Sequence, residues 1–87
     1  METESSSGFV VAEMNTHAFM FRGAGHTRDA ARTALLNAWR VHRGALLARY
    51  PERTDSIPDE TRMEDHFKIV YLEFDMDAGY RDGERVV

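Results

Sequence analysis

The sequence predicts an α+β domain, a two-layer sandwich in which one long helix packs on a three- or four-stranded, mainly antiparallel sheet. Three observations lead to this fold class: two short apolar segments at residues 9–14 and 17–22, a helical pattern at 28–50, and a strongly apolar segment at 67–75. A helix laid across one face of such a sheet buries both apolar surfaces. The expected order of elements is ββα(α)β(β).

The first two apolar segments predict a pair of strands. Residues 9–14 are rich in apolar and β-branched side chains, and residues 17–22 alternate between two faces. Asn15 and Thr16 lie between them, and asparagine tolerates the backbone of a tight turn, so we expect an antiparallel hairpin. One bent strand is the alternative. Gly23-Ala24-Gly25 is expected to end the second strand.

A long helix is predicted from residue 28 to about residue 50. Thr27 is suited to cap its N-terminus, and Asp29 in the first turn complements the helix dipole. Pro51 ends the helix because the residue before a proline disfavours helical geometry. At 100° per residue, one apolar stripe forms the expected buried face: Ala31, Leu35, Ala38, Trp39, His42 and Leu46.

The second half begins with a polar, acidic connection, residues 51–66. Pro58 is suited to the first turn of a short helix ending near Asp65, which Ile57 and Met63 would hold against the body. Residues 67–75 are apolar on nearly both faces, which predicts a central strand. Residues 84–87 are expected to add a short edge strand.

Length and composition indicate one ordinary globular domain. The chain has 87 residues, 43% of them hydrophobic and 30% charged. We expect an acidic, disordered tail at residues 1–7 and a single domain at 8–87. Cysteine is absent, which excludes disulfides and thiol chemistry, and no apolar run is long enough to span a membrane. The polar N-terminus does not resemble a signal peptide, so the cytoplasm is the expected location.

Charge is segregated along the chain, although its net value is only −4. Residues 8–50 carry six arginines against two acids, whereas residues 51–87 carry eleven acids against five basic residues. The net sign argues against general attraction to nucleic acid or anionic lipid. The acidic half instead predicts a protein partner with a basic surface, bound through Glu73, Asp75, Asp77, Asp82 and Glu84.

The alternative binding face is formed by arginines on the predicted helix, whose planar guanidinium groups suit carboxylate or phosphate ligands. It consists of Arg28, Arg32, Arg40 and Arg43. Nucleic-acid binding through this face is the second functional hypothesis. A further interpretation is that these arginines form a solvated helix face paired with the acidic second half.

No residue pattern predicts catalysis, a metal or a cofactor. The four histidines do not have chelating spacing, and among them His26, beside the helix N-terminus, is the best functional candidate. Gly23-Ala24-Gly25 lacks the remaining residues of phosphate-binding motifs. Residues 75–84 resemble a calcium loop only at their start, because Gly79 and Tyr80 stand where a ligand and a glycine are required. A small enzyme is therefore the third and least favoured hypothesis.

Aromatic side chains exceed the needs of a single small core. A helix covers only one face of the sheet, and Phe19 and Phe21 are expected on one face of their strand with Met20 on the other. Apolar surface is thus expected on the open side. Such a patch is typical of a partner-binding surface, and it leaves a homodimer open.

The segment from Phe19 to Ala31, followed by Leu35 and Ala38, resembles the strand–Gly-x-Thr–helix element of HicB-type antitoxins. Its matching residues are Gly25-His26-Thr27 and then Ala31. The resemblance covers about a third of the chain, and the remainder departs from the family, since no appended DNA-binding motif follows. What it implies is the order of sheet and helix, and a small protein that binds and blocks another protein.

These observations favour a non-enzymatic protein-binding module that inhibits or sequesters its partner. Small acidic inhibitors carried by mobile elements, such as anti-CRISPR proteins of phages, share this general profile. That comparison is an analogy at the level of size and charge.

Overall fold

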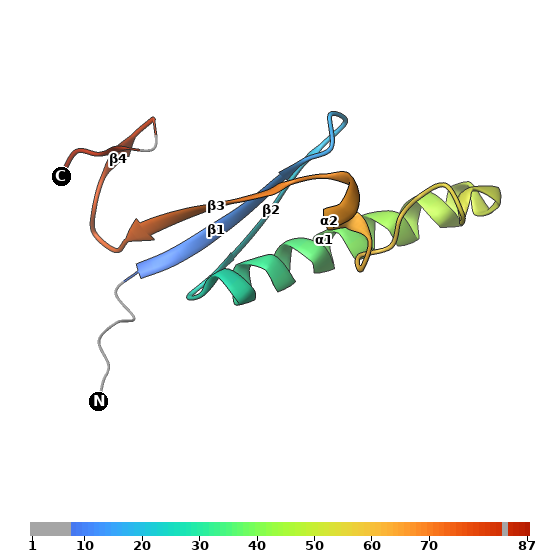
Figure 1. The fold of residues 1–87 in the computed structure, drawn as a ribbon, viewed down its shortest axis with the longest axis horizontal. Helices are drawn as coiled ribbons and strands as arrows, with labels where there is room; N and C mark the ends of the chain where they lie inside the picture. Colours follow the sequence, from blue (N-terminus) through green and yellow to red (C-terminus); the bar gives the residue numbers. More distant parts are fainter. Residues whose placement is uncertain (1–7, 83) are drawn as a thin grey trace.

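Two antiparallel strands, β1 (Gly8–Asn15) and β2 (Met20–Gly25), begin the part of the chain that the computed structural model describes, residues 8–82 and 84–87 (Figure 1). The predicted tail at 1–7 lies outside the described residues. The predicted hairpin is confirmed, but its turn is longer than Asn15-Thr16. Thr16 and Phe19 close this turn through a backbone hydrogen bond of 3.0 Å, and His17 has a φ of 73°.

The second strand therefore begins three residues later than predicted and includes Gly23 and Gly25. We expected these glycines to break the strand, and this prediction was wrong. Gly23 is buried against α1 (Arg28–Arg49), so close that a Cβ would collide with the backbone of Leu35 and Ala31. Glycine stands here because the helix approaches the strand at backbone distance.

Helix α1 confirms the predicted long helix. The Thr27 hydroxyl accepts a hydrogen bond of 3.0 Å from the Ala30 N–H and caps the first turn, as predicted. Its buried residues are Ala31, Leu35, Leu36 and Trp39. Leu36 thus joins the core, whereas Ala38 is exposed, because the helix is rotated slightly from the predicted stripe.

The sheet has the order β2-β1-β3, with every pair antiparallel. Strand β3 (Ile69–Asp75) is consequently an edge strand, and the prediction of a central position was wrong. Helix α1 packs mainly on β2 and β1 (Figure 1). The fold is the predicted α+β class, with a long helix on a three-stranded antiparallel sheet.

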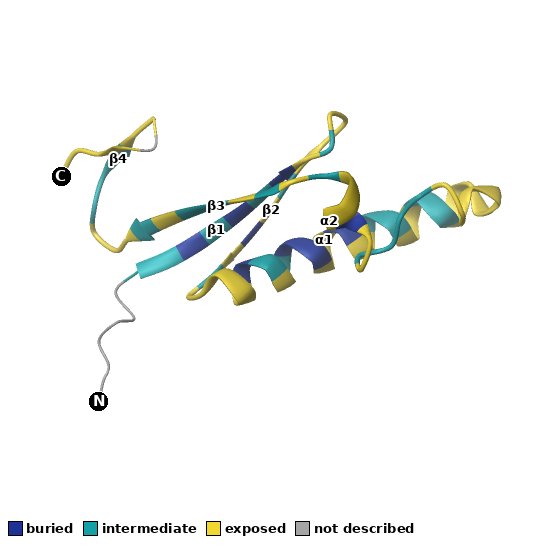
Figure 2. Ribbon diagram, in the orientation of Figure 1, coloured by how far each residue is buried: buried dark blue, intermediate teal, exposed yellow. Residues whose placement is uncertain are grey.

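The core lies between α1 and the strand face nearest to it (Figure 2). Strand β1 contributes every second residue, Val10, Ala12 and Met14, as the pleat requires. Met63, which is fully buried, closes the core from the connection. This residue was expected to hold the connection in place.

The connection contains the 3-10 helix η2 (Pro51–Arg53) and the one-turn helix α2 (Met63–His66), which is shorter than the predicted helix at 58–65. The Trp39 indole N–H donates to the Pro58 carbonyl at 2.8 Å and fixes the connection against α1. The remaining strands are β4 (Tyr80–Arg81) and β5 (Glu84–Arg85). They pair with each other as a separate two-stranded sheet, so the predicted edge strand at 84–87 does not extend the main sheet.

Candidate protein-binding surface

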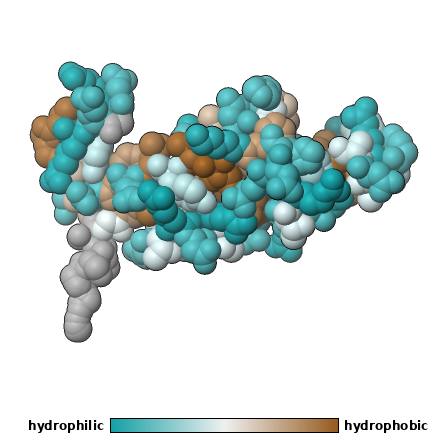
Figure 3. All heavy atoms as spheres, in the orientation of Figure 1, coloured by the Kyte–Doolittle hydropathy of each residue, from teal (hydrophilic) through white to brown (hydrophobic). Residues whose placement is uncertain are grey.

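The sheet face opposite α1, here called the open face, carries no helix among the described residues and is mainly apolar. Side chains alternate between the two faces along each strand. The open face therefore carries the β1 residues that alternate with the buried ones, together with their register partners in β2 and β3. Figure 3 shows apolar side chains gathered along the sheet, above the helix. The apolar residues of the open face are Phe9, Val11, Met20, Ala24, Val70, Leu72 and Phe74.

An aromatic cluster marks one end of the open face. The rings of Phe9 and Phe74 stack with centroids 5.3 Å apart, and Tyr80 meets Phe74 edge-on at 4.9 Å. The Tyr80 hydroxyl accepts a 2.8 Å hydrogen bond from the Asp75 backbone N–H, and Arg85 pairs with the Asp75 carboxylate at 2.9 Å. These contacts fix the β4–β5 hairpin at this end of the sheet.

The other end of the open face is hollowed. An ion pair of 2.8 Å joins Glu13 and Arg22 across the face. Val70 beside this pair and Met20 beyond it remain 46% and 47% exposed. The hollow beside them has a volume of about 340 Å³. It is lined by Glu13, Asn15, His17, Met20, His66, Phe67, Lys68 and Val70.

Two of the five predicted acidic binding residues are engaged in ion pairs within the chain. Glu73 and Asp75 lie on the helix side of β3, because their register partners are Val10 and Gly8. Glu73 pairs with Arg28 at 2.9 Å, and Asp75 pairs with Arg85 as described above. Both carboxylates remain solvent-exposed.

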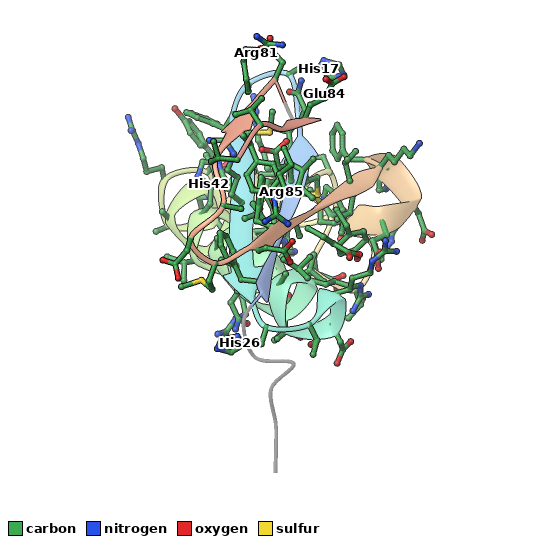
Figure 4. All side chains as sticks on the ribbon, turned by 90° about the vertical axis from the view of Figure 1, so that its left-hand side faces the viewer. His17, His26, His42, Arg81, Glu84 and Arg85 are labelled. Atoms are coloured by element: carbon green, nitrogen blue, oxygen red, sulfur yellow. The ribbon has the colours of Figure 1, made fainter. Side chains whose placement is uncertain are left out.

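The other three acids are all exposed. Asp77 lies in the turn after β3, and Asp82 and Glu84 lie in the β4–β5 hairpin. Asp77 and Asp82 have φ values of 64° and 53°, which aspartate tolerates better than most residues, so both also serve the turns in which they lie. Glu84 faces Arg81 across the small sheet. In Figure 4, Arg81 and Glu84 lie at the top of the view, above the sheet. The structure therefore brings these acids close to the aromatic end of the open face.

The arginines of the predicted binding face pair with the acidic second half of the chain. This agrees with the interpretation of these arginines as a solvated helix face. Besides the Arg28–Glu73 pair, Arg32 pairs with Glu64, and Arg40 approaches Glu60 at 3.9 Å. Arg43 donates to the carbonyl oxygens of Ile57 and Thr54 at 3.0 and 3.3 Å. All four side chains thus contact the connection or β3, which reduces the donors that they offer to an external ligand.

The Arg32–Glu64 pair gives the fold a small pH dependence. The hydrogen bond from Arg32 lowers the pKa of the Glu64 carboxyl, so the pair stabilises the fold above the ordinary glutamate pKa and loses this effect as the pH falls through the lowered pKa. Glu64→Gln is expected to reduce the free energy of unfolding by about 0.2–1 kcal/mol at neutral pH, the usual range for exposed pairs.

Urea unfolding of the wild type and of Glu64→Gln at several pH values measures this difference. It is expected to vanish in acid, where the wild-type carboxyl is itself protonated. Glu52→Gln, at an exposed position in η2, serves as the control and is expected to leave stability unchanged. A difference for Glu64→Gln that persisted in acid would assign the effect to packing.

A second apolar hollow lies between the β1–β2 turn, the C-terminal half of α1 and the connection. Its volume is about 360 Å³, and the ring of His42 lies 5.1 Å from that of Phe19 and 5.6 Å from that of Trp39. His42 and Leu46 were expected to be buried by the sheet. They are only half-buried, because the 22-residue helix is about 33 Å long and extends past the shorter strands.

The histidines do not form a common site in the described part of the chain. His17, His26 and His42 project from separate places in Figure 4. His26 shares a hollow of about 150 Å³ with Glu73 and Asp75, but both carboxylates are already paired with arginines. No group of three or more potential metal-binding side chains occurs among the described residues.

None of the described helices is long and apolar enough to cross a membrane. Comparisons with protein-family models, with curated proteins and with solved structures found no match for this chain. The resemblance to HicB-type antitoxins therefore stays a prediction. The open face is the feature of the fold from which function can be argued.

Proposed function

We propose that this chain is a non-enzymatic module that binds another protein through its open face and thereby inhibits or sequesters it. The observation that carries the proposal is the apolar character of a sheet face on which no helix packs. Soluble monomers rarely expose a contiguous apolar patch of this kind without using it for binding. The hollow at one end of the open face, beside Met20 and Val70, also offers a concave site for a protruding side chain.

Burial of apolar surface supplies the expected driving force. Each Å² of apolar surface removed from water contributes about 25 cal/mol, and Met20 and Val70 are only half-covered by the chain itself. The rigid sheet presents these side chains without a folding cost on binding. The central contacts of the complex are therefore expected to be apolar.

The acids beside the aromatic cluster indicate the chemistry of the partner. Asp77, Asp82 and Glu84 are exposed, and Arg81 lies opposite Glu84 on the small sheet. A partner with an apolar patch bordered by lysine or arginine would complement this end of the open face. Such charges mainly accelerate association and select the partner. Binding is thus expected to weaken as salt concentration rises.

Met20→Lys is expected to abolish capture of the partner, because it places a charge on the open face. Val41→Lys is the matched control: Val41 is 70% exposed on α1 and remote from the open face. The test is an affinity capture from native host lysate with wild type and both variants, washed at low and high salt. Circular dichroism checks that each variant is folded.

The proposal is supported if one protein is captured in stoichiometric amount by the wild type and by Val41→Lys but not by Met20→Lys. Equal capture by all three proteins would contradict binding through the open face. Recovery of nuclease-sensitive nucleic acid would instead favour the alternative, binding through Arg28, Arg32, Arg40 and Arg43. That alternative requires these arginines to exchange their present partners for phosphate.

A further inference from the structure

The outer edge of β3 presents unpaired backbone groups whose direction follows from two hydrogen bonds. The Asp75 N–H donates to the Tyr80 hydroxyl, so it points away from β1. In an antiparallel sheet, successive residues point alternately toward and away from the neighbouring strand. Glu73, Tyr71 and Ile69 therefore also direct their N–H and C=O groups outward. The Thr16–Phe19 hydrogen bond leads to the same result independently. It shows that the even-numbered residues of β1 direct their backbone groups toward β2, so the odd-numbered residues of β1 face β3 and the odd-numbered residues of β3 face outward.

This edge carries charged side chains only at its C-terminal half, Glu73 and Asp75, and both are paired with arginines of the same chain. Within Ile69–Asp75 there is no proline, and β3 pairs continuously with β1 without a bulge. Among the described residues, none of the outward groups of Ile69, Tyr71 and Glu73 has a backbone partner. An edge of this kind is suited to pair with another strand.

The opposite edge of the sheet is less suitable. Strand β2 directs the backbone of Met20, Arg22 and Ala24 outward by the same alternation. A symmetric pairing about its centre would place Arg22 directly opposite Arg22 of the second strand, and like charges in that position are destabilising. Two glycines within β2 weaken it further as a pairing strand.

We propose that two copies of this chain pair through the free edges of β3, antiparallel and about a two-fold axis at Tyr71. In this register Tyr71 faces Tyr71 of the second copy, and Ile69 faces Glu73. All three outward residues of each strand are then paired, giving about six backbone hydrogen bonds, two for each directly bonded pair. The register ends where the Asp75 N–H is already bonded to Tyr80.

Side chains and charges also fit this register. On the open face, Val70 lies beside Leu72 of the second copy, so apolar residues face each other across the new strand pair. The two Glu73 side chains lie four residues apart along the strands, about 13 Å, which exceeds the screening length in physiological salt. Each is also paired with Arg28. The dimer has a continuous six-stranded sheet, and it doubles the open face without covering it.

The absence of cysteine from the chain allows a direct test of the register. Val70→Cys and Leu72→Cys are made singly, tagged differently, mixed and oxidised. In the proposed register these positions form a non-hydrogen-bonded pair with Cα atoms about 4.5 Å apart, within disulfide range. Identical positions lie about 7–8 Å apart, at or beyond that range. The mixed disulfide is therefore expected in several-fold excess over either homodimeric product.

Ala24→Cys on the opposite edge and Val41→Cys on α1 are the controls, and both are expected to remain uncrosslinked. Sedimentation of the unmodified protein over a wide concentration range is expected to give twice the mass of the single chain. A mass of one chain throughout would overturn the proposal. So would crosslinking of Ala24→Cys, or of Leu72→Cys mainly to itself, because each indicates a different pairing. These measurements need no partner, so their outcome is separate from that of the capture experiment.

Discussion

Gly23→Ala is expected to cost the domain about 3 kcal/mol or more, and to leave a large fraction of the chain unfolded in mild denaturant. A Cβ at this position would collide with the amide nitrogen of Leu35 and the carbonyl oxygen of Ala31, and would lie 2.9 Å from the carbonyl carbon of Ala34. These atoms belong to the backbone of α1, so no rotamer change relieves the overlap. The helix must move away from β2 and open the core.

The expected loss is a large share of the total stability, which is about 4–13 kcal/mol for a chain of 87 residues. Gly44→Ala is the matched control, because a Cβ there meets no atom within 4 Å and the residue lies inside α1. Alanine at that position is expected to stabilise the domain by about 0.5–1 kcal/mol through helix propensity. Urea unfolding of both variants measures the free energy of unfolding, which is expected to fall for Gly23→Ala and to rise for Gly44→Ala. Equal small effects would contradict the close approach of α1 to β2.

Met63→Ala is expected to reduce the free energy of unfolding by about 2–4 kcal/mol. Met63 is the fully buried core residue of the connection, so truncation of its side chain leaves a cavity in the core. The connection is otherwise held by the half-buried Ile57, by surface ion pairs and by hydrogen bonds from Trp39 and Arg43 to its carbonyl groups. Its local unfolding is expected to accompany the loss of stability.

Met76→Ala provides the control, since Met76 is 55% exposed in the turn after β3. This change is expected to alter stability by less than about 0.5 kcal/mol, as surface substitutions usually do. Thermal and urea unfolding distinguish the two methionines, and hydrogen exchange reports whether residues of the connection open first. Similar small effects at both positions would place Met63 outside the core.

Helix α1 could be predicted closely from the sequence because its signals are local. The Thr27 cap, the apolar spacing of Ala31, Leu35 and Trp39, and Pro51 all act within a few residues of the backbone that they specify. The sheet was predicted less well. Gly23 and Gly25 were predicted to end the strand, because glycines in a sequence usually indicate a turn. Their role as a contact surface for α1 depends on packing between elements, which local sequence does not show.

The apolar character of residues 67–75 illustrates the same limit for the candidate site. Apolar side chains on both faces of a strand predicted a central position, whereas β3 lies at the edge with one face toward the core and the other on the open face. Composition alone cannot distinguish a strand buried on both sides from one whose outer face is exposed. This ambiguity is why the open face was expected only in outline.

By itself, the sequence determined the fold class, the helix and its cap, and the segregation of positive and negative charge between the two halves. Only the tertiary structure decided which charges meet, so that Arg28 pairs with Glu73 and Arg32 with Glu64. It also decided which strand is central and which sheet face remains open. The physical reason is range: capping and periodicity depend on neighbours along the chain, whereas strand order, ion pairing and exposure depend on residues that folding brings together from distant positions.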